Sequence, residues 1–534
     1  MGDANLYSTK ILGLPVEAGM TPASTVSPLD LVPTVINLMI RENTESVVVL
    51  DNNRPVGIVT ERDILQRVIQ TGKNHELTVV NQIMSSNPLV TIEMGRTIGE
   101  ALELLHKHNI RRVIVTREGA LVGLSTERGL LEIVHSHYLL QAVLPAKPAD
   151  DAHRIRIAYV STYPPRECGI ATYTKHLVDA TSTFCARVVT SPVVVAINER
   201  GALYDYESQV TSQIEANVLE SYEKVARYIN ASNVDVVNLQ HEYGIFGGEW
   251  GEYVTGFLKS IQKPVVTTLH TVLEKPVLEA KHVLGQVLQH SDFVIVMARV
   301  GLEILEQSYD FYGDRVRHVP HGCPNVPYLG TSMSKQNLGL QDRPVISTFG
   351  LLSRGKGIEY AIEALPTVVK EHPEAMYLVI GETHPEIRNR QGEEYRQFLL
   401  NLVESLGLEN NVRFVNRFLD ENELINYLHA TDVYVVPYPN REQISSGTLT
   451  YALGTGKAIV TTPFLHAEEV ISRGAAMKCD FEDPASIAES VNLLLNDDAI
   501  RKRFGRIAYE YSRSMIWPNV AMSYVNVFYH ALGL

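Results

Sequence analysis

Cysteine and long apolar runs are scarce in this sequence of 534 residues. Its four cysteines, Cys168, Cys185, Cys323 and Cys479, are scattered without a C-x-x-C pair. This spacing argues against a zinc site and against a disulfide framework, so we expect reduced thiols. No stretch reaches the uninterrupted apolar length of a membrane span, and no apolar segment follows the N-terminal "MGDANLYSTK". We therefore expect a cytoplasmic protein without a membrane span.

Positive charge is also in short supply. The chain has 47 Lys and Arg against 61 Asp and Glu, a formal net charge of −14 at pH 7. This balance argues against non-specific binding to nucleic acid or to an anionic membrane, although local cations can still hold a phosphate. There is no low-complexity tract, and the composition of 45% hydrophobic and 20% charged residues is that of a globular protein. The length exceeds one ordinary core, so we expect two to four domains.

An internal repeat occupies the N-terminal part. The segment "ESVVVLDNNRPVGIVTERDIL" (45–65) recurs as "RRVIVTREGALVGLSTERGLL" (111–131). Each copy predicts a strand, a turn, a second strand and the start of a helix, and each follows a helix-like stretch. The repeat therefore predicts one pseudo-symmetric α+β module.

Strands and long helices alternate in the rest of the chain. The Pro- and Ala-containing stretch "QAVLPAKPADDAH" (141–153) predicts a linker, and "RIRIAYVSTYPP" then begins a strand. A polar segment around 328–343 separates two such series. Each series predicts a parallel sheet with helices on both faces, and ligands of such sheets bind beyond the carboxyl ends of the strands.

Candidate residues of the first α/β series follow its strands. Gly169 and Thr172 come after the first strand, where a phosphate could approach, although an ordinary strand-to-helix turn is an equal alternative. His241, His270 and His321 each follow a strand. One such histidine is usually structural, but three at strand ends point to one cleft.

The second α/β series offers two anion-binding segments. Arg354 and Lys356 flank a glycine just before a helix, and Ser445, Ser446 and Gly447 open an apolar helix. First-turn N–H groups lack intrahelical partners, and the helix dipole favours an anion there. Two such walls in one domain favour a nucleotide diphosphate, although a pair of solvated charges in a turn is common.

From about Arg154 to its end, the chain resembles the retaining glycosyltransferases of family 4, which have the GT-B fold of two Rossmann-like domains. The resemblance rests on the ordered motifs "YPPRECGIATYT", "LQHEYGIFGG", "TLHTV", "VPHG", "LLSRGKGIEYAIEAL" and "ISSGTLTYALGTGKAIVTTP". The tail "SMIWPNVAMSYVNVF" resembles the family's final helix, which returns to the N-terminal domain.

The resemblance implies a nucleotide sugar in the C-terminal domain and an acceptor in the N-terminal one. It implies retention at the anomeric carbon and independence of metal, in agreement with the lack of an Asp-x-Asp motif after a strand, so no metal ligands are expected. Base recognition is expected around 416–418 and after Gly381. The residues it implies as catalytic are His241, Arg354 and Lys356. Those expected to bind substrate are Gly169, Ile170, His270, Glu442, Gln443, Ser445, Ser446, Gly447, Thr448 and Tyr451.

Two departures from the family pattern stand out. The family's arginine five residues before the motif lysine is Leu351 here, which leaves Arg354 as a substitute by proximity. Many members also carry a Glu-x₇-Glu pair, whose positions are Gln443 and Tyr451 in this chain. An amide can bind sugar hydroxyls but carries no charge, and the adjacent Glu442 could compensate.

The N-terminal repeat resembles a tandem pair of CBS domains, which sense adenine nucleotides. In "VGIVTERDI", Thr60 and Asp63 match residues that hold ribose hydroxyls. The second copy keeps Thr126 but has Gly129 in place of the aspartate, so we expect one competent site and one weakened site. The alternative is a module that serves only for dimerisation.

These expectations combine into an α/β enzyme in which two Rossmann-like domains (GT-B) follow an α+β CBS pair. The expected parts are the CBS module (1–140), a linker (141–153), the acceptor domain (154–335), the nucleotide-sugar domain (336–510) and the returning helix (511–534). We expect a homo-oligomeric hexosyltransferase that needs no cofactor. We also expect AMP, ADP or ATP to regulate it. The alternatives are a retaining phosphorylase that uses a sugar 1-phosphate, and a catalytically silent nucleotide sensor.

Overall fold

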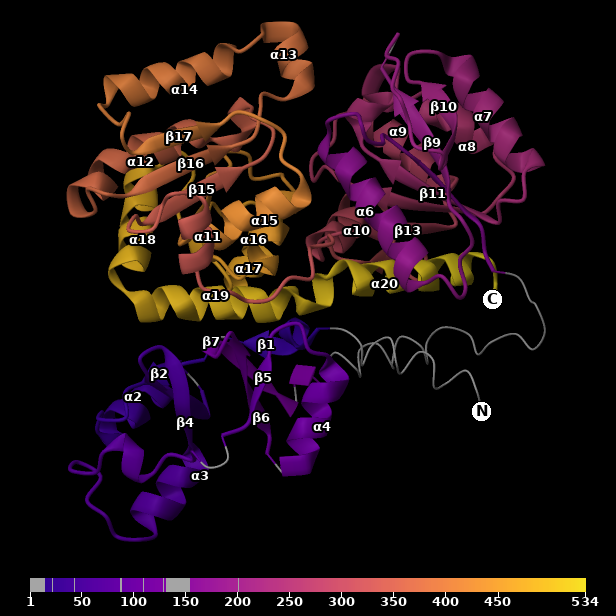
Figure 1. Cartoon of the computed structure of the whole chain (residues 1–534). Helices are drawn as coiled ribbons and strands as arrows, with labels where there is room; N and C mark the ends of the chain where they lie inside the picture. The colour runs from indigo at the N-terminus through magenta and orange to yellow at the C-terminus, as the bar shows by residue number, and fades with distance from the viewer. Residues whose placement is uncertain are drawn as a thin grey trace, which may run out of the picture. The chain divides into compact units, whose positions relative to one another are not determined.

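The computed structural model describes residues 15–130, apart from 22, 43, 87–88, 109 and 128, and residues 154–534, apart from 200. The predicted linker 141–153 and residues 1–14 and 131–140 of the predicted CBS module lie outside the described residues. The chain divides into two compact units (Figure 1). The first comprises Met1–Gln141, Asn325–Asn337 and Asp497–Arg503; the second comprises Ala142–Pro324, Leu338–Asn496 and Phe504–Leu534.

The two sequence repeats fold alike within the first unit. In the first copy Ser46 pairs with Thr60 across an antiparallel hairpin, and in the second Arg112 pairs with Thr126 at the equivalent register. The hydrophobic side chains Val48 and Ile114, which hold equivalent positions, share one small core cluster. The strands are β1 (Met20–Thr21), β2 (Thr25–Val26), β3 (Ser46–Asp51), β4 (Arg54–Thr60), β5 (Thr91–Glu93), β6 (Arg112–Arg117) and β7 (Ala120–Thr126). The helices are α2 (Val32–Glu42), α3 (Glu61–Ile64), α4 (Ile98–His108) and, grouped with this unit, α11 (Ser332–Asn337).

The second unit contains two parallel sheets, which confirms the prediction of two Rossmann-like domains. The first sheet has the order β10-β9-β8-β11-β12-β13-β14, in which the direction of strand addition reverses between β8 and β11. Its strands are β8 (Ile157–Ser161), β9 (Val193–Asn198), β10 (Val210–Glu215), β11 (Val236–His241), β12 (Val265–Leu269), β13 (Phe293–Val296) and β14 (Val316–His318). Its helices are α6 (Gly169–Phe184), α7 (Leu219–Ala231), α8 (Val254–Ser260), α9 (Leu278–Gln289) and α10 (Val300–Tyr309).

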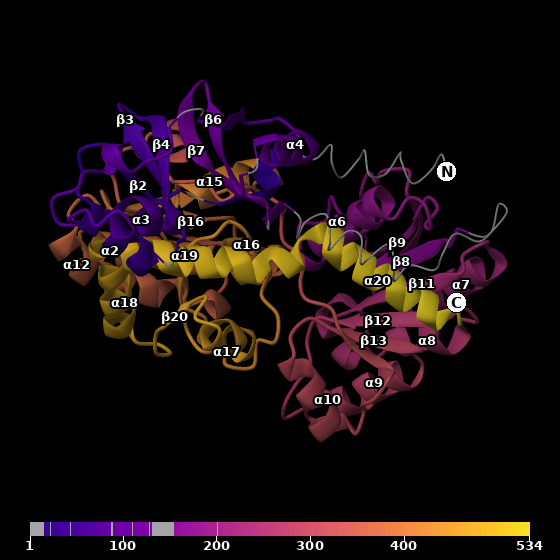
Figure 2. The ribbon, with the colours of Figure 1, turned by 90° about the horizontal axis from the view of Figure 1, so that it is seen from below.

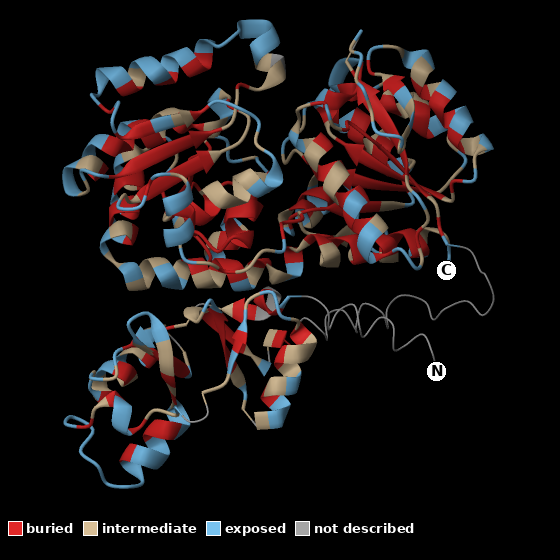
Figure 3. Cartoon of the chain, viewed as in Figure 1, coloured by how far each residue is buried: buried red, intermediate tan, exposed pale blue. Residues whose placement is uncertain are grey.

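The edge strand β10 is the main element that the sequence pattern did not predict in this sheet. Its residues alternate between partly buried and exposed, and it pairs in parallel with β9. The central strands, by contrast, are buried on both faces, as Figure 3 shows, and β8 is largely apolar. An edge strand with a polar face carries a weaker signal because neighbouring strands, not its own hydrophobicity, hold it.

The second sheet has the order β17-β16-β15-β18-β19-β20, with the reversal between β15 and β18. Its strands are β15 (Val345–Phe349), β16 (Met376–Ile380), β17 (Val412–Val415), β18 (Val433–Val436), β19 (Ala458–Thr461) and β20 (Met477–Lys478). The helices are α12 (Ile358–Glu371), α13 (Pro385–Gln391), α14 (Glu394–Ser405), α15 (Glu421–Ala430), α16 (Gly447–Gly454), α17 (Leu465–Ser472), α18 (Pro484–Asn496) and α19 (Asp498–Ser512).

The last helix, α20 (Trp517–Ala531), packs against α6 and β12 of the first Rossmann-like domain. Figure 2 shows it running along that domain after α19. The buried Tyr524 hydroxyl lies 2.8 Å from the Tyr173 hydroxyl and 2.9 Å from Thr268 Oγ1. The C-terminal segment therefore ties the two Rossmann-like domains together. Within the described part of the chain, no helix combines the length and the apolar character needed to cross a membrane.

Candidate functional site

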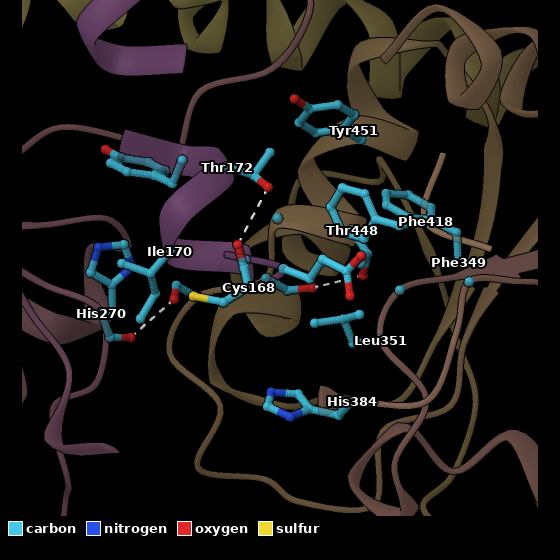
Figure 4. Close-up of a pocket in the computed structure, with 18 of the residues that line it drawn as sticks. Cys168, Ile170, Thr172, His270, Phe349, Leu351, His384, Phe418, Thr448 and Tyr451 are labelled. Atoms are coloured by element: carbon cyan, nitrogen blue, oxygen red, sulfur yellow. Dashed lines mark hydrogen bonds between the residues drawn. The ribbon is translucent and has the colours of Figure 1, made fainter. Parts of the chain in front are cut away.

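A cavity of about 810 Å³ lies between the two Rossmann-like domains (Figure 4). Its walls come mainly from the loops after β8, β11, β12 and β14 on one side and after β15, β16, β17 and β18 on the other. Both reversals of strand order lie at these loops, so the cavity has the location expected for the ligand of a doubly wound sheet. The predicted site residues on its walls are Gly169, Ile170, His270, Lys356, Gln443, Ser445, Ser446, Gly447, Thr448 and Tyr451.

The N-terminus of α16 provides a shorter anion cradle than the sequence suggested. Ser446 is the N-cap, and its Oγ accepts a hydrogen bond from the Leu449 N–H at 3.3 Å. The Ser446 N–H is already donated to His466 Nδ1 at 3.0 Å. The first-turn N–H groups that remain without an intrahelical acceptor are those of Gly447 and Thr448. Of the predicted segment Ser445, Ser446 and Gly447, only the Gly447 N–H is such a donor, and the Thr448 N–H joins it.

Lys356 brings a cation to this cradle. Its Nζ donates to the Tyr438 hydroxyl at 2.8 Å, and the same hydroxyl lies 2.8 Å from Thr448 Oγ1. Gly350, with φ of 138°, directly follows β15, and a Cβ there would lie 3.3 Å from Thr448 Cγ2. The glycine thus leaves room for a ligand next to the lysine.

Arg354 lies away from the cavity wall. Its guanidinium lies over the rings of Tyr395 and Phe398, 5.6 and 5.1 Å from their centroids, and 3.8 Å from Glu394. Arg354 and Lys356 belong to one 3₁₀ turn, Arg354–Lys356, and residues two apart on such a turn point in different directions. The structure therefore separates the two cations that the sequence placed together.

Two neutral histidines line the opposite wall. His270 Nε2 lies 2.8 Å from Gln240 Oε1, and the Gln240 amide is fixed because its Nε2 donates to Asn238 Oδ1. His321 Nδ1 lies 2.8 Å from the Gly322 carbonyl. Burial lowers the pKa of His270 to about 3 and that of His321 to about 4. Both rings are therefore neutral near pH 7, with the nitrogen named above as the donor.

His241 is not on the cavity wall. Its ring is fully buried between Tyr243 and Phe246, neither ring nitrogen has a hydrogen-bond partner among the described residues, and burial lowers its pKa to about 4. Successive residues of a strand point to opposite faces. Gln240 reaches the wall residue His270, so Glu242 shares that face and His241 points the other way. The wall residue at this place is Glu242. It follows the same strand as His241 but was not among the expected site residues, although the two-residue period of a strand tells the two apart.

The positions of the missing carboxylate pair are filled differently. Gln443 lines the cavity, but its Nε2 already donates to the Ser445 carbonyl at 2.7 Å. Glu442 is not on the wall, although the sequence offered it as compensation. The Tyr451 hydroxyl lies 3.0 Å from Glu421 Oε1 and 2.9 Å from His176 Nδ1. A carboxylate therefore does reach this corner, but it comes from Glu421 of α15.

The segments predicted for base recognition also reach the cavity. Arg417 and Phe418 line it on one side of the second domain, and Gly381 and His384 line it after β16. Arg417 is held by two 2.8 Å hydrogen bonds to Glu423. Phe418 is 46% exposed, which leaves apolar surface for a planar group.

In the first unit, Thr60 and Asp63 cap α3 reciprocally. Asp63 Oδ2 accepts from the Thr60 N–H at 2.8 Å and from Thr60 Oγ1 at 2.6 Å. In the second copy, Thr126 Oγ1 accepts from the Gly129 N–H at 3.0 Å, and glycine offers no carboxylate. The predicted nucleotide site of the first copy therefore has both a hydroxyl and a carboxylate, whereas that of the second copy has the hydroxyl alone. Over the described ranges, no group of three or more His, Cys, Asp or Glu side chains is arranged to hold a metal ion.

Comparison with known proteins places these observations in context. The family model for glycosyl transferases group 1 matches residues 331–511, and the CBS domain model matches residues 16–70 and 80–136. The D-inositol 3-phosphate glycosyltransferase of Corynebacterium urealyticum is 27% identical over 251 residues. That alignment covers 46% of this chain and 58% of the relative, so it spans little more than half of the relative's length.

Solved structures agree on the fold. The sucrose-phosphate synthase of Thermosynechococcus elongatus matches 71% of this chain and 100% of its own, with a TM-score of 0.59 and 17% identity. HepE of Anabaena, solved in complex with UDP, matches 70% of this chain and 100% of its own, with a TM-score of 0.55 and 15% identity. Together with the two family models, the two parallel sheets and the paired repeats identify this chain as a tandem pair of CBS domains followed by a GT-B fold that contains a glycosyl transferases group 1 domain.

Proposed function

We propose that this protein is a retaining hexosyltransferase, which moves a hexose from a nucleotide-diphosphate sugar to an acceptor hydroxyl without a metal ion or other cofactor. One observation carries the proposal. Lys356 is linked to Thr448 by hydrogen bonds through the Tyr438 hydroxyl. Thr448 lies in the first turn of α16, where two N–H groups lack intrahelical acceptors. A cation beside free N–H donors, in a cavity between two Rossmann-like domains, suits a diphosphate.

The proposed chemistry needs charge stabilisation more than a strong base. The bond between the anomeric carbon and the diphosphate oxygen breaks, and its electron pair leaves on the diphosphate. The acceptor oxygen forms the new bond on the same face, and its proton passes to the departing phosphate. Lys356 and the N–H groups of Gly447 and Thr448 stabilise the charge that builds on the leaving group. The neutral His270 and His321 offer hydrogen bonds on the other wall.

The candidate substrates follow from the relatives. HepE shares the fold and was solved with UDP, so a UDP-sugar is the first donor to test. Arg417 and Phe418 would contact the base, and Gln443 the sugar hydroxyls through its remaining acceptor oxygen. The name of the Corynebacterium relative contains D-inositol 3-phosphate, so inositol with and without its phosphate is one pair of candidate acceptors for this chain.

Removal of the lysine charge tests this proposal. The full chain is first screened by thermal shift against UDP-, GDP-, ADP- and dTDP-glucose, and product formation is then measured with the best donor. We expect Lys356→Ala to lower kcat/KM about 100-fold, because it removes a charge that stabilises the leaving group. The matched control Lys370→Ala removes an exposed cation from α12 of the same domain. Equal activity of the Lys356→Ala protein and the control would contradict the proposal.

A retaining phosphorylase is the second candidate. Gln443 and Tyr451 bring no carboxylate to the positions where many family members have one, and this observation keeps the alternative open. Incubation with a disaccharide and inorganic phosphate would then release a sugar 1-phosphate. Tight binding of a nucleotide sugar with neither transfer nor hydrolysis would instead favour the catalytically silent sensor.

We also propose that adenine nucleotide at the CBS pair regulates transfer and that the chain self-associates through this pair. The support is the match of both repeats to the CBS model and the carboxylate of Asp63 beside Thr60. AMP, ADP and ATP are the candidate regulators. A ligand that favours one arrangement of the pair can shift the balance between conformations of the whole chain.

A further inference from the structure

Glu242 is a carboxylate without an ion-pair partner on the wall of the cavity. It follows β11 directly and lines the cavity on the side of the first Rossmann-like domain. Its Oε1 accepts the Tyr243 N–H at 3.0 Å, and its Oε2 accepts the Thr271 hydroxyl at 2.6 Å. Among the described residues no cationic side chain forms a salt bridge with it, and burial raises its pKa. Each oxygen keeps a lone pair for a ligand.

The cations of the same wall are already engaged. Arg166 Nε lies 2.8 Å from Glu199 Oε1, and its Nη1 donates to the Ile197 carbonyl at 3.0 Å. Lys175 Nζ lies 3.2 Å from Asp179 Oδ2. The charge of each of these cations is therefore offset by a carboxylate of its own domain. Among the described residues of this wall, Glu242 is the charged side chain that has no salt-bridge partner.

The neighbours of Glu242 accept hydrogen bonds as well. His270 uses Nε2 toward Gln240 Oε1, so the neutral ring keeps its Nδ1 lone pair. This nitrogen has no hydrogen-bond partner in the described structure. Glu242 and His270 directly follow the paired ends of the adjacent parallel strands β11 and β12, so the acceptors lie side by side. The wall offers acceptors to a ligand that brings donors.

We propose that Glu242 and His270 bind donor groups of the sugar acceptor, so that this acceptor is a neutral or amine-bearing polyol and not a phosphorylated one. This inference rests on the proposed function and names the substrate class of its acceptor side. Hydroxyl or ammonium groups complete the hydrogen bonds of a desolvated carboxylate. Glu242 orients the acceptor and takes no proton in the transfer, because the proton leaves with the phosphate.

The two walls of the cavity carry opposite charges. The diphosphate is expected beside Lys356, whereas the opposite wall carries Glu242 with no compensating cation. A phosphate on the acceptor would face this carboxylate, and the repulsion between the two negative charges disfavours such a complex. An ammonium group at the same place would instead be attracted by the Glu242 carboxylate. The Glu242 carboxylate therefore disfavours a phosphorylated acceptor and favours an amine-bearing one.

Three hexoses with the same ring test this inference: glucose, glucosamine and glucose 6-phosphate. Their binding to the full chain is measured by calorimetry with UDP present, so that the result does not depend on turnover. We expect glucosamine to bind about tenfold more tightly than glucose 6-phosphate, with glucose in between. In Glu242→Gln we expect the ratio to fall to about twofold, because the amide keeps the shape but loses the charge. Glu249→Gln, an exposed glutamate seven residues later, is the matched control.

The outcomes separate this inference from the proposed function. Equal or tighter binding of glucose 6-phosphate by the wild-type protein would overturn the inference, as would failure of all three hexoses to bind. An unchanged ratio in Glu242→Gln would also overturn it, because another group would then set the preference. Charge discrimination without any sugar transfer would support the inference and contradict the proposed transferase activity.

Discussion

At the scale of single residues, the pair of Tyr438 and Lys356 distinguishes this cavity. Burial alone would raise the pKa of Tyr438, but the adjacent Lys356 charge and the hydrogen bonds of Lys356, Ser446 and Thr448 lower it overall. The phenol also lies under the ammonium, 4.5 Å from ring centroid to Nζ. One side chain therefore anchors the lysine and connects it to the α16 cradle.

Substitution Tyr438→Phe tests this anchoring. We expect nucleotide-sugar affinity at neutral pH to fall about fivefold, the value of one hydrogen bond of about 1 kcal/mol. The pKa of Tyr438 is lowered, so its phenolate forms as pH rises and cancels part of the Lys356 charge before an ordinary tyrosine would titrate. Wild-type affinity should thus decline on the alkaline side, whereas Tyr438→Phe should hold its own affinity to higher pH. Parallel pH profiles of the two proteins, measured by calorimetry, would contradict this role.

At the scale of elements, the N-terminus of α16 is packed tightly against the other Rossmann-like domain. A Cβ on Gly447 would lie 3.0 Å from His321 Nε2. The same short segment also crosses the cavity through Ser445, whose Oγ donates to the His270 carbonyl at 3.0 Å. The helix start is therefore held in place by the domain that faces it.

Substitution Gly447→Ala should consequently weaken both stability and donor binding. We expect a loss of about 1–3 kcal/mol in the free energy of unfolding, because the methyl group must displace the His321 ring. Gly285→Ala in α9 is the control, since nothing lies within 4 Å of its added Cβ. The double variant Gly447→Ala/His321→Ala should recover part of the loss, and simple additivity in denaturant titrations would show that the contact is not the cause.

At the scale of the whole molecule, the CBS pair carries two copies of one motif with unequal chemistry. The first copy has the Asp63 carboxylate beside Thr60, and the second has Gly129 beside Thr126. A ligand that needs both a hydroxyl and a carboxylate therefore finds one complete site. The cap of α4 in the second copy has the same geometry as the first site, since Glu100 accepts the Thr97 N–H at 2.8 Å.

Binding of AMP to the full chain tests this asymmetry. At one hundred times its Kd, a ligand raises the free energy of unfolding by about 2.7 kcal/mol, and we expect a corresponding rise in Tm with AMP. Asp63→Asn should abolish this rise because the carboxylate for the ribose is gone. Glu100→Gln alters a similar helix cap and should keep the rise, which separates loss of binding from damage to the module. If AMP still raises the Tm of Asp63→Asn, the proposed site is wrong.

The sequence by itself determined the two Rossmann-like domains, the paired repeats and most of the cavity wall. Buried apolar strands alternate with amphipathic helices, and a site built from strand-end loops follows from that order. The lysine turn and the start of α16 were therefore found by position alone. The sequence pattern did not predict the polar edge strand β10, because pairing with β9 and not its own hydrophobicity holds it in the sheet.

Only the tertiary structure decided which side chains face the cavity. Local spacing placed Arg354 with Lys356 and selected His241, but the 3₁₀ turn sends Arg354 onto Phe398, and strand alternation buries His241. Glu421 reaches Tyr451 from a different helix, a contact across 30 residues that no local motif encodes. Side-chain direction depends on packing between distant segments, and for that reason the charge on the acceptor wall became visible only in the folded chain.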